Sequence, residues 1–295
     1  MRRLKFERQF PEWNPDAANR NEDSMFKRQR EGSVVCPFCG KLVGVKDREC
    51  WNCGKRNPGM WGFAPVLRHI GYNLGFVTIV TWGCAALYIA TLLYDPQGVQ
   101  SRGINLLEPR TFSLFTFGAS GAAPVFGYGR WWTLLSAAWL HGGVLHILFN
   151  MLWVRQLAPE TSELYGISRT IIIYTISAVS GFLLSTFAGT SLTIGASAPI
   201  FGLLGALVFY GRRGGGSHIS RQAMTYAVIL FVFGFIFPGI DNFAHLGGFL
   251  GGLAAGWLLN PLKQERVEHL IAALACIVLT ALSIVVSIFH TLRLS

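Results

Sequence analysis

The stretch TIGASAPIFG, residues 193–202, opens an apolar segment that runs to Tyr210 and contains no charged residue. Ser197 stands near the start of this segment, among small residues. Small residues then recur every four positions, at Ala198, Gly202 and Ala206. Because residues four apart share one face of a helix, that face carries almost no side-chain volume, and a second helix can approach it closely in a membrane.

A second apolar segment offers a matching face, with small residues again at steps of four, at Ala244, Gly248, Gly252 and Gly256. His245 stands next to the first of them. The two faces predict a serine and a histidine held within hydrogen-bond reach inside a bilayer. We expect the rest of the chain to support this pair.

The composition indicates a polytopic membrane protein. The 295 residues are 52% hydrophobic and only 14% charged, whereas a soluble domain carries roughly 25% charged residues. The net charge of +10 is compatible with nucleic-acid binding, but the basic residues gather in the N-terminal region and the short loops. That distribution is typical of positive-inside topology. No apolar run follows the first residues, so we expect no signal peptide.

Seven apolar segments have roughly the length that a helix needs to cross a bilayer. They are residues 73–94, 144–159, 169–189, 196–211, 222–239, 243–260 and 268–290. The second is short, and residues 130–140 either continue it or lie at the membrane surface. The sequence therefore predicts an all-α polytopic membrane protein with seven transmembrane helices.

The loops predict how these helices are oriented. With the N-terminus in the cytoplasm, the loops after the second, fourth and sixth segments are cytoplasmic, and each holds Lys or Arg. The short outer loops, near Thr190 and at 238–241, hold neither, in agreement with the positive-inside rule. One outer connection is long, residues 95–130. In this orientation Ser197 and His245 share a depth just below the outer surface.

The N-terminal part of the chain predicts a polar tail and a metal site. Residues 1–31 are polar and charged and cannot bury enough apolar area to fold alone, so we expect a flexible tail. Four of the six cysteines follow in a C-x2-C-x10-C-x2-C pattern, at Cys36, Cys39, Cys50 and Cys53. This spacing predicts a structural zinc ribbon at 32–57 and a linker at 58–72. The ribbon serves either as a structural knob or as a dock for a protein partner, and nucleic-acid binding is disfavoured.

Polar side chains also gather at the start of the second apolar segment. His146 and Asn150 are four residues apart and share a helix face, and His141 precedes them. The segment runs inward from the outer surface, so these three residues lie at the depth of Ser197 and His245. Polar groups inside a membrane span are costly and mark functional sites. The five residues therefore predict one site.

The chemistry that this set favours is nucleophilic acyl transfer. Ser197 attacks a carbonyl carbon while His245 takes the serine proton. The resulting oxyanion needs hydrogen-bond donors, which the Asn150 amide, the His146 ring and the backbone N–H of Ser197 can supply. Asp241 lies at the membrane edge and no span holds an acidic residue to orient the base, so we expect a Ser–His dyad that needs no catalytic cofactor.

Two other interpretations stay open. The three histidines His141, His146 and His245 match the ligand number of a catalytic zinc site. The spacing lacks the HExxH form, however, and no glutamate base lies nearby. Alternatively, the histidines and Asn150 join helices by hydrogen bonds, and Ser197 is only a small packing residue.

Residues 131–260 resemble a rhomboid intramembrane serine protease. The resemblance rests on WW at 131–132 with the leucine pair that follows, HxxxxHxxxN at 141–150, GAS at 195–197, and AHLGG at 244–248 with Gly251 and Gly252 beyond it. It covers the apolar segments but neither the ribbon nor the tail. It implies a rhomboid-like core of six transmembrane helices at 73–260. Residues 261–295 then form a cytoplasmic loop and an appended seventh transmembrane helix.

The resemblance also implies roles for the site residues. Ser197 is the nucleophile and His245 the general base. The oxyanion hole consists of His146, Asn150 and the Ser197 amide. The supporting residues are His141 in a packing or gating position, Gly195 in the serine motif, and Phe201, on whose ring the catalytic histidine stacks.

The remaining parts of the resemblance concern the surroundings of the site. The 95–130 connection matches the membrane-embedded L1 structure of the family, and the fifth helix with the loop near Pro238 matches the gate and cap. The implied substrates are transmembrane proteins in a lipid bilayer, cut in or near their helices. Since no transit peptide is present, we expect a multi-pass protein of a prokaryotic plasma membrane.

Two positions depart from the family pattern. Ala198 follows the serine where the family usually has glycine, and Thr133 follows the tryptophan pair where it often has arginine, with Arg130 just upstream. The first departure adds a methyl group at a close helix contact, and the second changes the anchoring of L1. They leave open a second function, a non-proteolytic rhomboid-like protein that binds client helices.

Overall fold

The structure, a computed structural model, describes residues 28–66, 75–102, 105–237 and 239–294. The chain divides into two compact units, Met1–Ile70 and Gly71–Ser295. Most of the predicted tail, the start of the first predicted span and Pro238 of the predicted cap lie outside the described residues.

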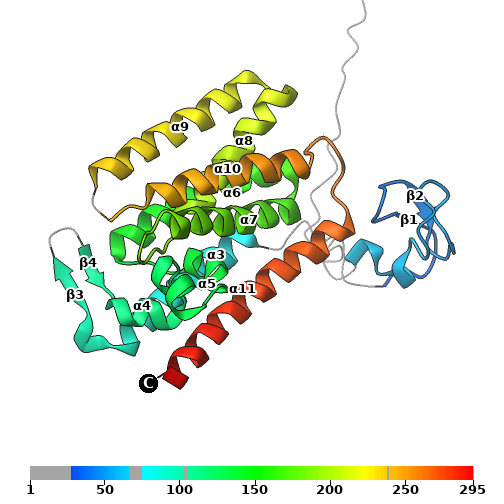
Figure 1. Ribbon diagram of the computed structural model, residues 1–295. Coiled ribbons are helices and arrows are strands. Elements are labelled where there is room, and N and C mark those ends of the chain that lie inside the picture. The colour runs from blue at the N-terminus through cyan, green and yellow to red at the C-terminus, as the bar shows by residue number, and fades with distance from the viewer. Residues whose placement is uncertain (1–27, 67–74, 103–104, 238, 295) are drawn as a thin grey trace, which may run out of the picture. The chain divides into compact units, whose positions relative to one another are not determined.

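The N-terminal unit is built around a short β-hairpin. Strand β1, Ser33–Val35, pairs with the antiparallel strand β2, Leu42–Gly44 (Figure 1). A 3₁₀ turn, η1, follows at Met60–Gly62. The buried core of the unit consists of Val34, Cys36, Val43, Val45, Cys50 and Ala64. A core of this size does not offset the entropy lost on folding, so the unit needs a further constraint such as a bound metal ion.

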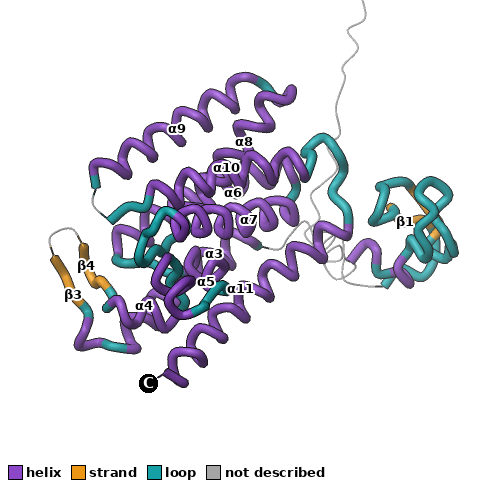
Figure 2. Tube along the Cα trace, viewed as in Figure 1, coloured by secondary structure: helices purple, strands orange, loops and turns teal. Residues whose placement is uncertain are grey.

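The second unit is mainly helical, with one short pair of strands, β3 and β4 (Figures 1 and 2). A helix lies at each of the seven predicted apolar segments: α3 at Phe76–Tyr94, α6 at Val144–Tyr165, α7 at Ile167–Phe187, α8 at Ser197–Tyr210, α9 at Ser217–Ile236, α10 at Asn242–Leu258 and α11 at Val267–Leu294. Between α3 and α6 lie η2 at Pro96–Gly98, β3 at Gln100–Arg102, β4 at Asn105–Glu108, α4 at Thr111–Phe117, η3 at Ala123–Gly127, α5 at Thr133–Ser136 and η4 at Ala137–Trp139. A π-helical turn, η5 at Gly211–Gly215, joins α8 to α9.

Length and composition alone single out some of the seven predicted spans. Among the described residues, four helices, α3, α7, α9 and α11, are each long and apolar enough to cross a membrane alone. The segment 133–139 and α6 together make a fifth, bent by 96° between them. Helices α8 and α10 have only 14 and 17 residues, fewer than the ~20 of a full span.

Helix α8 is short because the buried chain just before it is irregular and does not continue the helix. Thr193, Gly195 and Ala196 are buried and precede the helix in non-helical conformation. Irregular backbone is tolerated at membrane depth only where protein covers it. Residues 198–208 of α8 are all buried, so protein surrounds this helix along nearly its whole length.

The two small-residue faces predicted from the sequence pack against each other. Any β-carbon on Gly252 of α10 would collide with the carbonyl oxygen of Gly202, and one on Gly248 would collide with that of Ala198. Further along, the position of a β-carbon on Gly256 lies 3.3 Å from Cα of Ala206. Close backbone approach of this kind gives dense van der Waals packing where a bilayer provides no hydrophobic driving force.

Hydrogen bonds between polar groups join the helix ends on the side of the bundle opposite to the start of α8. Nη1 of Arg169, in the first turn of α7, donates to the carbonyl oxygens of Leu259 at 3.0 Å and Asn260 at 2.8 Å, at the end of α10. The carboxylate of Glu265 accepts from the backbone N–H of Arg169 at 3.0 Å. Each helix end thus gains partners for groups that its own hydrogen bonds leave unsatisfied.

The glycine contact between α8 and α10 predicts a large effect of one methyl group. Substitution Gly252→Ala forces the helices apart and should lower the free energy of unfolding by about 1–3 kcal/mol. The matched control is Gly127→Ala, because a β-carbon there meets no atom within 4 Å. Thermal unfolding of the purified protein in detergent measures both. Equal transition temperatures for the two variants would contradict the packing described here.

Candidate functional site

Three helices supply the candidate residues at one end of the bundle. Ser197 is the first residue of α8 and is half-buried, His245 lies in the first turn of α10, and His146 and Asn150 lie in the first two turns of α6. Each residue therefore stands at a helix start. The first backbone N–H groups of a helix have no acceptor in that helix and create a positive potential there.

His146 is oriented by a backbone donor. The N–H of Gly142 donates to Nδ1 of His146 at 3.1 Å, so a neutral ring carries its hydrogen on Nε2. A β-carbon on Gly195 would lie 2.7 Å from that Nε2 and 3.8 Å from Oγ of Ser197. The ring N–H and the serine hydroxyl thus flank the same glycine, whose φ of +120° also disfavours any side chain.

Asn150 is buried, and its side-chain amide donates to the carbonyl oxygen of His146 at 2.8 Å, within α6. One amide hydrogen is therefore used inside the helix. The other is the hydrogen that Asn150 can offer to an oxyanion.

His245 is held on two sides. Its ring stacks on that of Phe201 with centroids 4.2 Å apart and planes 15° apart. Its Nδ1 lies 3.2 Å from Oδ1 of Asn242. Because an amide oxygen only accepts, this contact requires the hydrogen on Nδ1 and leaves the Nε2 lone pair free to take a proton.

Asn242 was not among the residues predicted from the sequence. Its spacing of three residues before His245, on one helix face, was the available signal. Asp241, by contrast, is engaged in capping α10: one oxygen accepts from the Ala244 N–H at 3.0 Å and the other from the hydroxyl of Ser185. No described hydrogen bond joins Ser197 to His245. Catalytic hydrogen bonds are often long in the absence of substrate.

His141 is fully buried and packs edge-to-face on His146, with ring centroids 5.1 Å apart. Within the described part of the chain, the metal-ligating side chains that come close enough to share an ion are four cysteines only. The histidines form no such group, so the geometry does not support the alternative of a three-histidine metal site.

Ala198, which departs from the family pattern, has a glycine opposite. A β-carbon on Gly181 of α7 would lie 2.7 Å from the methyl carbon of Ala198. The methyl group is fully buried in the space that Gly181 leaves. This departure is therefore absorbed by packing.

Arg130, upstream of the second departure, anchors the connection to α11. Its guanidinium lies 4.1 Å from the ring centroid of Phe115 and donates to the carbonyl oxygen of Ser287 at 3.1 Å. Trp132 Nε1 donates to the Ser287 hydroxyl at 3.0 Å. Thr133 donates back to the Arg130 carbonyl at 2.7 Å. A cation is thus present in this connection although Thr133 is uncharged.

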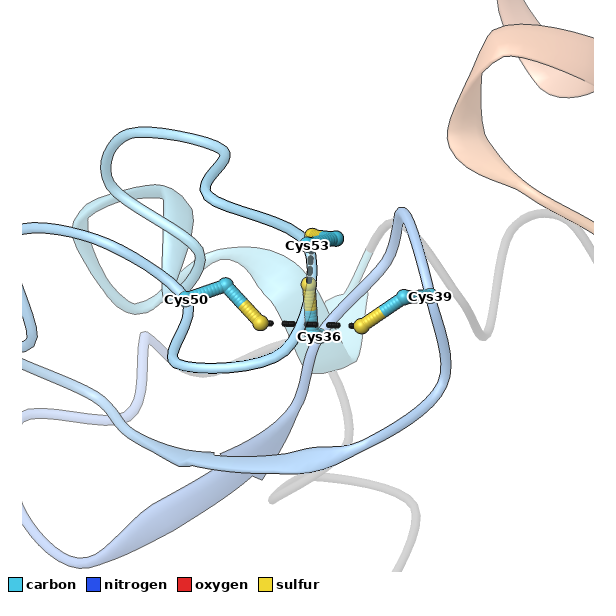
Figure 3. Close-up of side chains that lie close together, drawn as sticks. All are labelled: Cys36, Cys39, Cys50 and Cys53. Carbon is cyan, nitrogen blue, oxygen red and sulfur yellow. Dashed lines mark hydrogen bonds between the residues drawn. The ribbon is translucent and has the colours of Figure 1, made fainter.

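The four cysteines predicted to bind metal lie together in the N-terminal unit (Figure 3). Their ligand atoms all lie within 4.8 Å of one another, with Sγ–Sγ distances of 3.5 Å for Cys39–Cys50 and 3.9 Å for Cys36–Cys53. Burial opposes ionisation of Cys39, but hydrogen bonds, first from the Lys41 amide, outweigh it and lower the pKa of this thiol to about 7. The donor set suits a tetrahedral metal ion bound by thiolates.

Comparison with known proteins identifies the helical unit. Residues 128–262 match the model of the Rhomboid domain. The chain carries a rhomboid domain. The matched range contains Ser197, His245 and the other candidate residues of the helices, but not the cysteines.

The relatives of this rhomboid domain include plant and bacterial proteins. RHOMBOID-like protein 4 of Arabidopsis thaliana is 34% identical over 163 residues, which is 52% of this chain and 40% of that protein. Rhomboid protease GluP of Bacillus subtilis is 31% identical over 180 residues, 60% of this chain and 35% of GluP. For RHOMBOID-like protein 5 of Arabidopsis thaliana the values are 34% over 200 residues, 62% and 64%. The chain spans about half the length of the curated relatives that it matches.

The cysteine cluster predicts one bound metal ion per chain. Substitution Cys50→Ser should abolish most of the bound metal, because a three-thiolate site is open and binds more weakly. The control is Cys276→Ser, which removes a thiol from α11. Elemental analysis of the purified variants measures the ratio, and full metal content in Cys50→Ser would contradict the site.

Proposed function

We propose that this chain is an intramembrane serine endopeptidase, which hydrolyses peptide bonds in or near the transmembrane helices of membrane proteins. The observation that carries the proposal is the placement of the His146 ring nitrogen and the Ser197 hydroxyl around Gly195. A histidine held with its Nε2 free completes the set. The rhomboid domain supports the same reaction, since one relative is named a rhomboid protease.

The proposed mechanism uses Ser197 and His245 as a dyad. Nε2 of His245 takes the hydroxyl proton of Ser197 while Oγ attacks the carbonyl carbon of the scissile peptide bond. The tetrahedral oxyanion accepts hydrogen bonds from Nε2–H of His146 and from the Ser197 backbone N–H, whose helix start adds positive potential. Asn150 offers a third donor.

The second half of the reaction returns the enzyme to its starting state. The protonated His245 gives its proton to the leaving amine, and the C–N bond breaks to leave an ester on Ser197. Water then gives a proton to His245 and attacks the ester carbonyl. Collapse of the second tetrahedral state releases the acid product and returns the proton to Ser197.

Asn242 acts as a positioning residue in this scheme. By accepting the Nδ1 hydrogen it fixes the tautomer and the ring orientation of His245. It also stabilises the positive ring that forms when His245 takes the serine proton. The Asn242 amide thus orients His245 in place of a carboxylate, since the carboxylate of Asp241 caps α10.

The proposed orientation follows from the Lys and Arg bias of the loops. With a cytoplasmic N-terminus, the starts of α6, α8 and α10 face the outer side, where water for the hydrolysis reaches the ester. A prokaryotic plasma membrane is the proposed location. The metal in the N-terminal unit is proposed to be structural zinc, and the ribbon to be a dock for a protein partner.

A non-proteolytic, client-binding role is the second candidate. The absence of a described hydrogen bond between Ser197 and His245 is the observation that favours it. In that case the same helices hold a client without cutting it.

The proposed reaction predicts complete dependence on one hydroxyl group. Substitution Ser197→Ala should lower kcat for a transmembrane peptide in liposomes by about 10⁴-fold or more. The control is Ser191→Ala, an exposed serine shortly before the same helix. Cleavage by the wild type and the control alone supports the protease. Equal biological complementation by wild type and Ser197→Ala would favour the client-binding role.

The role of Asn242 predicts a change in kcat without a change in KM. Loss of one orienting hydrogen bond in Asn242→Ala should lower kcat about tenfold. Asn242→Asp keeps an acceptor and should recover most of the rate. A merely structural role would instead lower thermal stability in both variants, and unchanged kcat in Asn242→Ala would contradict the assignment.

A further inference from the structure

A pocket of about 230 Å³ lies between α6, α8 and α9, towards the end of α6 and the start of α9. Its apolar walls include Leu157 of α6 and Leu207 of α8, both buried. Its polar lining includes Glu160 and Glu163 of α6 together with Tyr226 of α9. The proposed reaction uses none of these residues.

Neither glutamate has an ion-pair partner among the described residues. The two stand three residues apart on α6 and are exposed at the pocket. Like charges at this spacing repel each other on a helix. Two carboxylates beside an apolar wall therefore favour a cation that comes from outside this chain.

The pocket lies at a defined distance from the candidate site. Both lie along α6, which carries Asn150 near its start and Glu163 near its end. The two residues are 13 positions apart, which corresponds to about 20 Å at 1.5 Å per residue of helix. A helical substrate that runs beside α6 with its scissile bond at Ser197 thus brings a residue about 13 positions away to the pocket.

We propose that this pocket binds a Lys or Arg side chain at the far end of the substrate's transmembrane helix. This inference rests on the proposed protease function. The apolar wall takes the alkyl part of the side chain and the two carboxylates take its charged group. Membrane helices commonly carry Lys and Arg at their cytoplasmic ends. The position of the pocket then determines how many residues separate this basic end from the bond that is cut.

The experiment compares matched substrates and matched variants of the full chain in liposomes. Three transmembrane peptides differ only at the residue 13 positions from the scissile bond, which is Arg, Gln or Glu. Wild type should cleave the Arg peptide with a kcat/KM about three- to tenfold above that of the Gln peptide, in line with a partly exposed ion pair. High salt should reduce the difference.

The variants assign this preference to the pocket. The double variant E160Q/E163Q should cleave the Gln peptide at the wild-type rate but lose the preference for Arg. E160K/E163K should prefer the Glu peptide. The matched control is Glu268→Gln on α11, which changes a glutamate outside the pocket and should keep the preference.

The outcomes separate failure of this inference from failure of the proposed function. Equal kcat/KM for the Arg and Gln peptides with wild type overturns the inference and leaves the protease intact. An Arg preference that persists in E160Q/E163Q also overturns it. The inference is also overturned if the effect of E160Q/E163Q depends on how many lipids in the liposomes carry an amine headgroup and not on the charge of the peptide. Cleavage of no peptide by wild type overturns the proposed function itself.

Discussion

The carbonyl groups of α8 lie directly against glycines of α10, and the geometry of the candidate site depends on this contact. A single β-carbon at Gly248 or Gly252 has no room. Because Ser197 and His245 stand in the first turns of these two helices, the glycine contact sets how far apart their side chains lie. Bilayers offer little hydrophobic force between helices, so packing of backbone against backbone has to hold the pair.

Around that contact, each polar side chain of the site is oriented by a neighbouring group. The Gly142 amide orients His146, and Asn242 and Phe201 orient His245. Ser197 stands at the start of α8, where the first backbone N–H groups have no acceptor within the helix. In a medium of low dielectric constant, preset donors cost little reorganisation when charge develops. The same arrangement would serve poorly in a flexible site, and the close packing of α8 against α10 keeps this one rigid.

Much of this arrangement was accessible from the sequence, for identifiable reasons. Small residues at steps of four predicted the α8–α10 face, and the C-x2-C-x10-C-x2-C pattern predicted the cysteine cluster, because both depend on local periodicity. The predicted segment 196–211 matches α8 to within one residue at each end, but the sequence did not show the 96° bend between residues 133–139 and α6. Asn242 and the Gly142 donor were also missed. Their roles come from the direction of single hydrogen bonds, which residue spacing alone does not reveal.

The bond between Arg130 and Ser287 has a consequence for the making of the protein. Arg130 is fully buried, and a carbonyl oxygen 157 residues later in the chain accepts one of its hydrogens. At ~5–20 residues per second, synthesis of that partner follows roughly 8–30 s after Arg130 itself. During this interval the guanidinium has neither its acceptor nor the cover of α11. The packing around Arg130 is therefore completed only after the last helix has been made, and chaperones or lipid headgroups have a defined period in which to meet an uncovered cation.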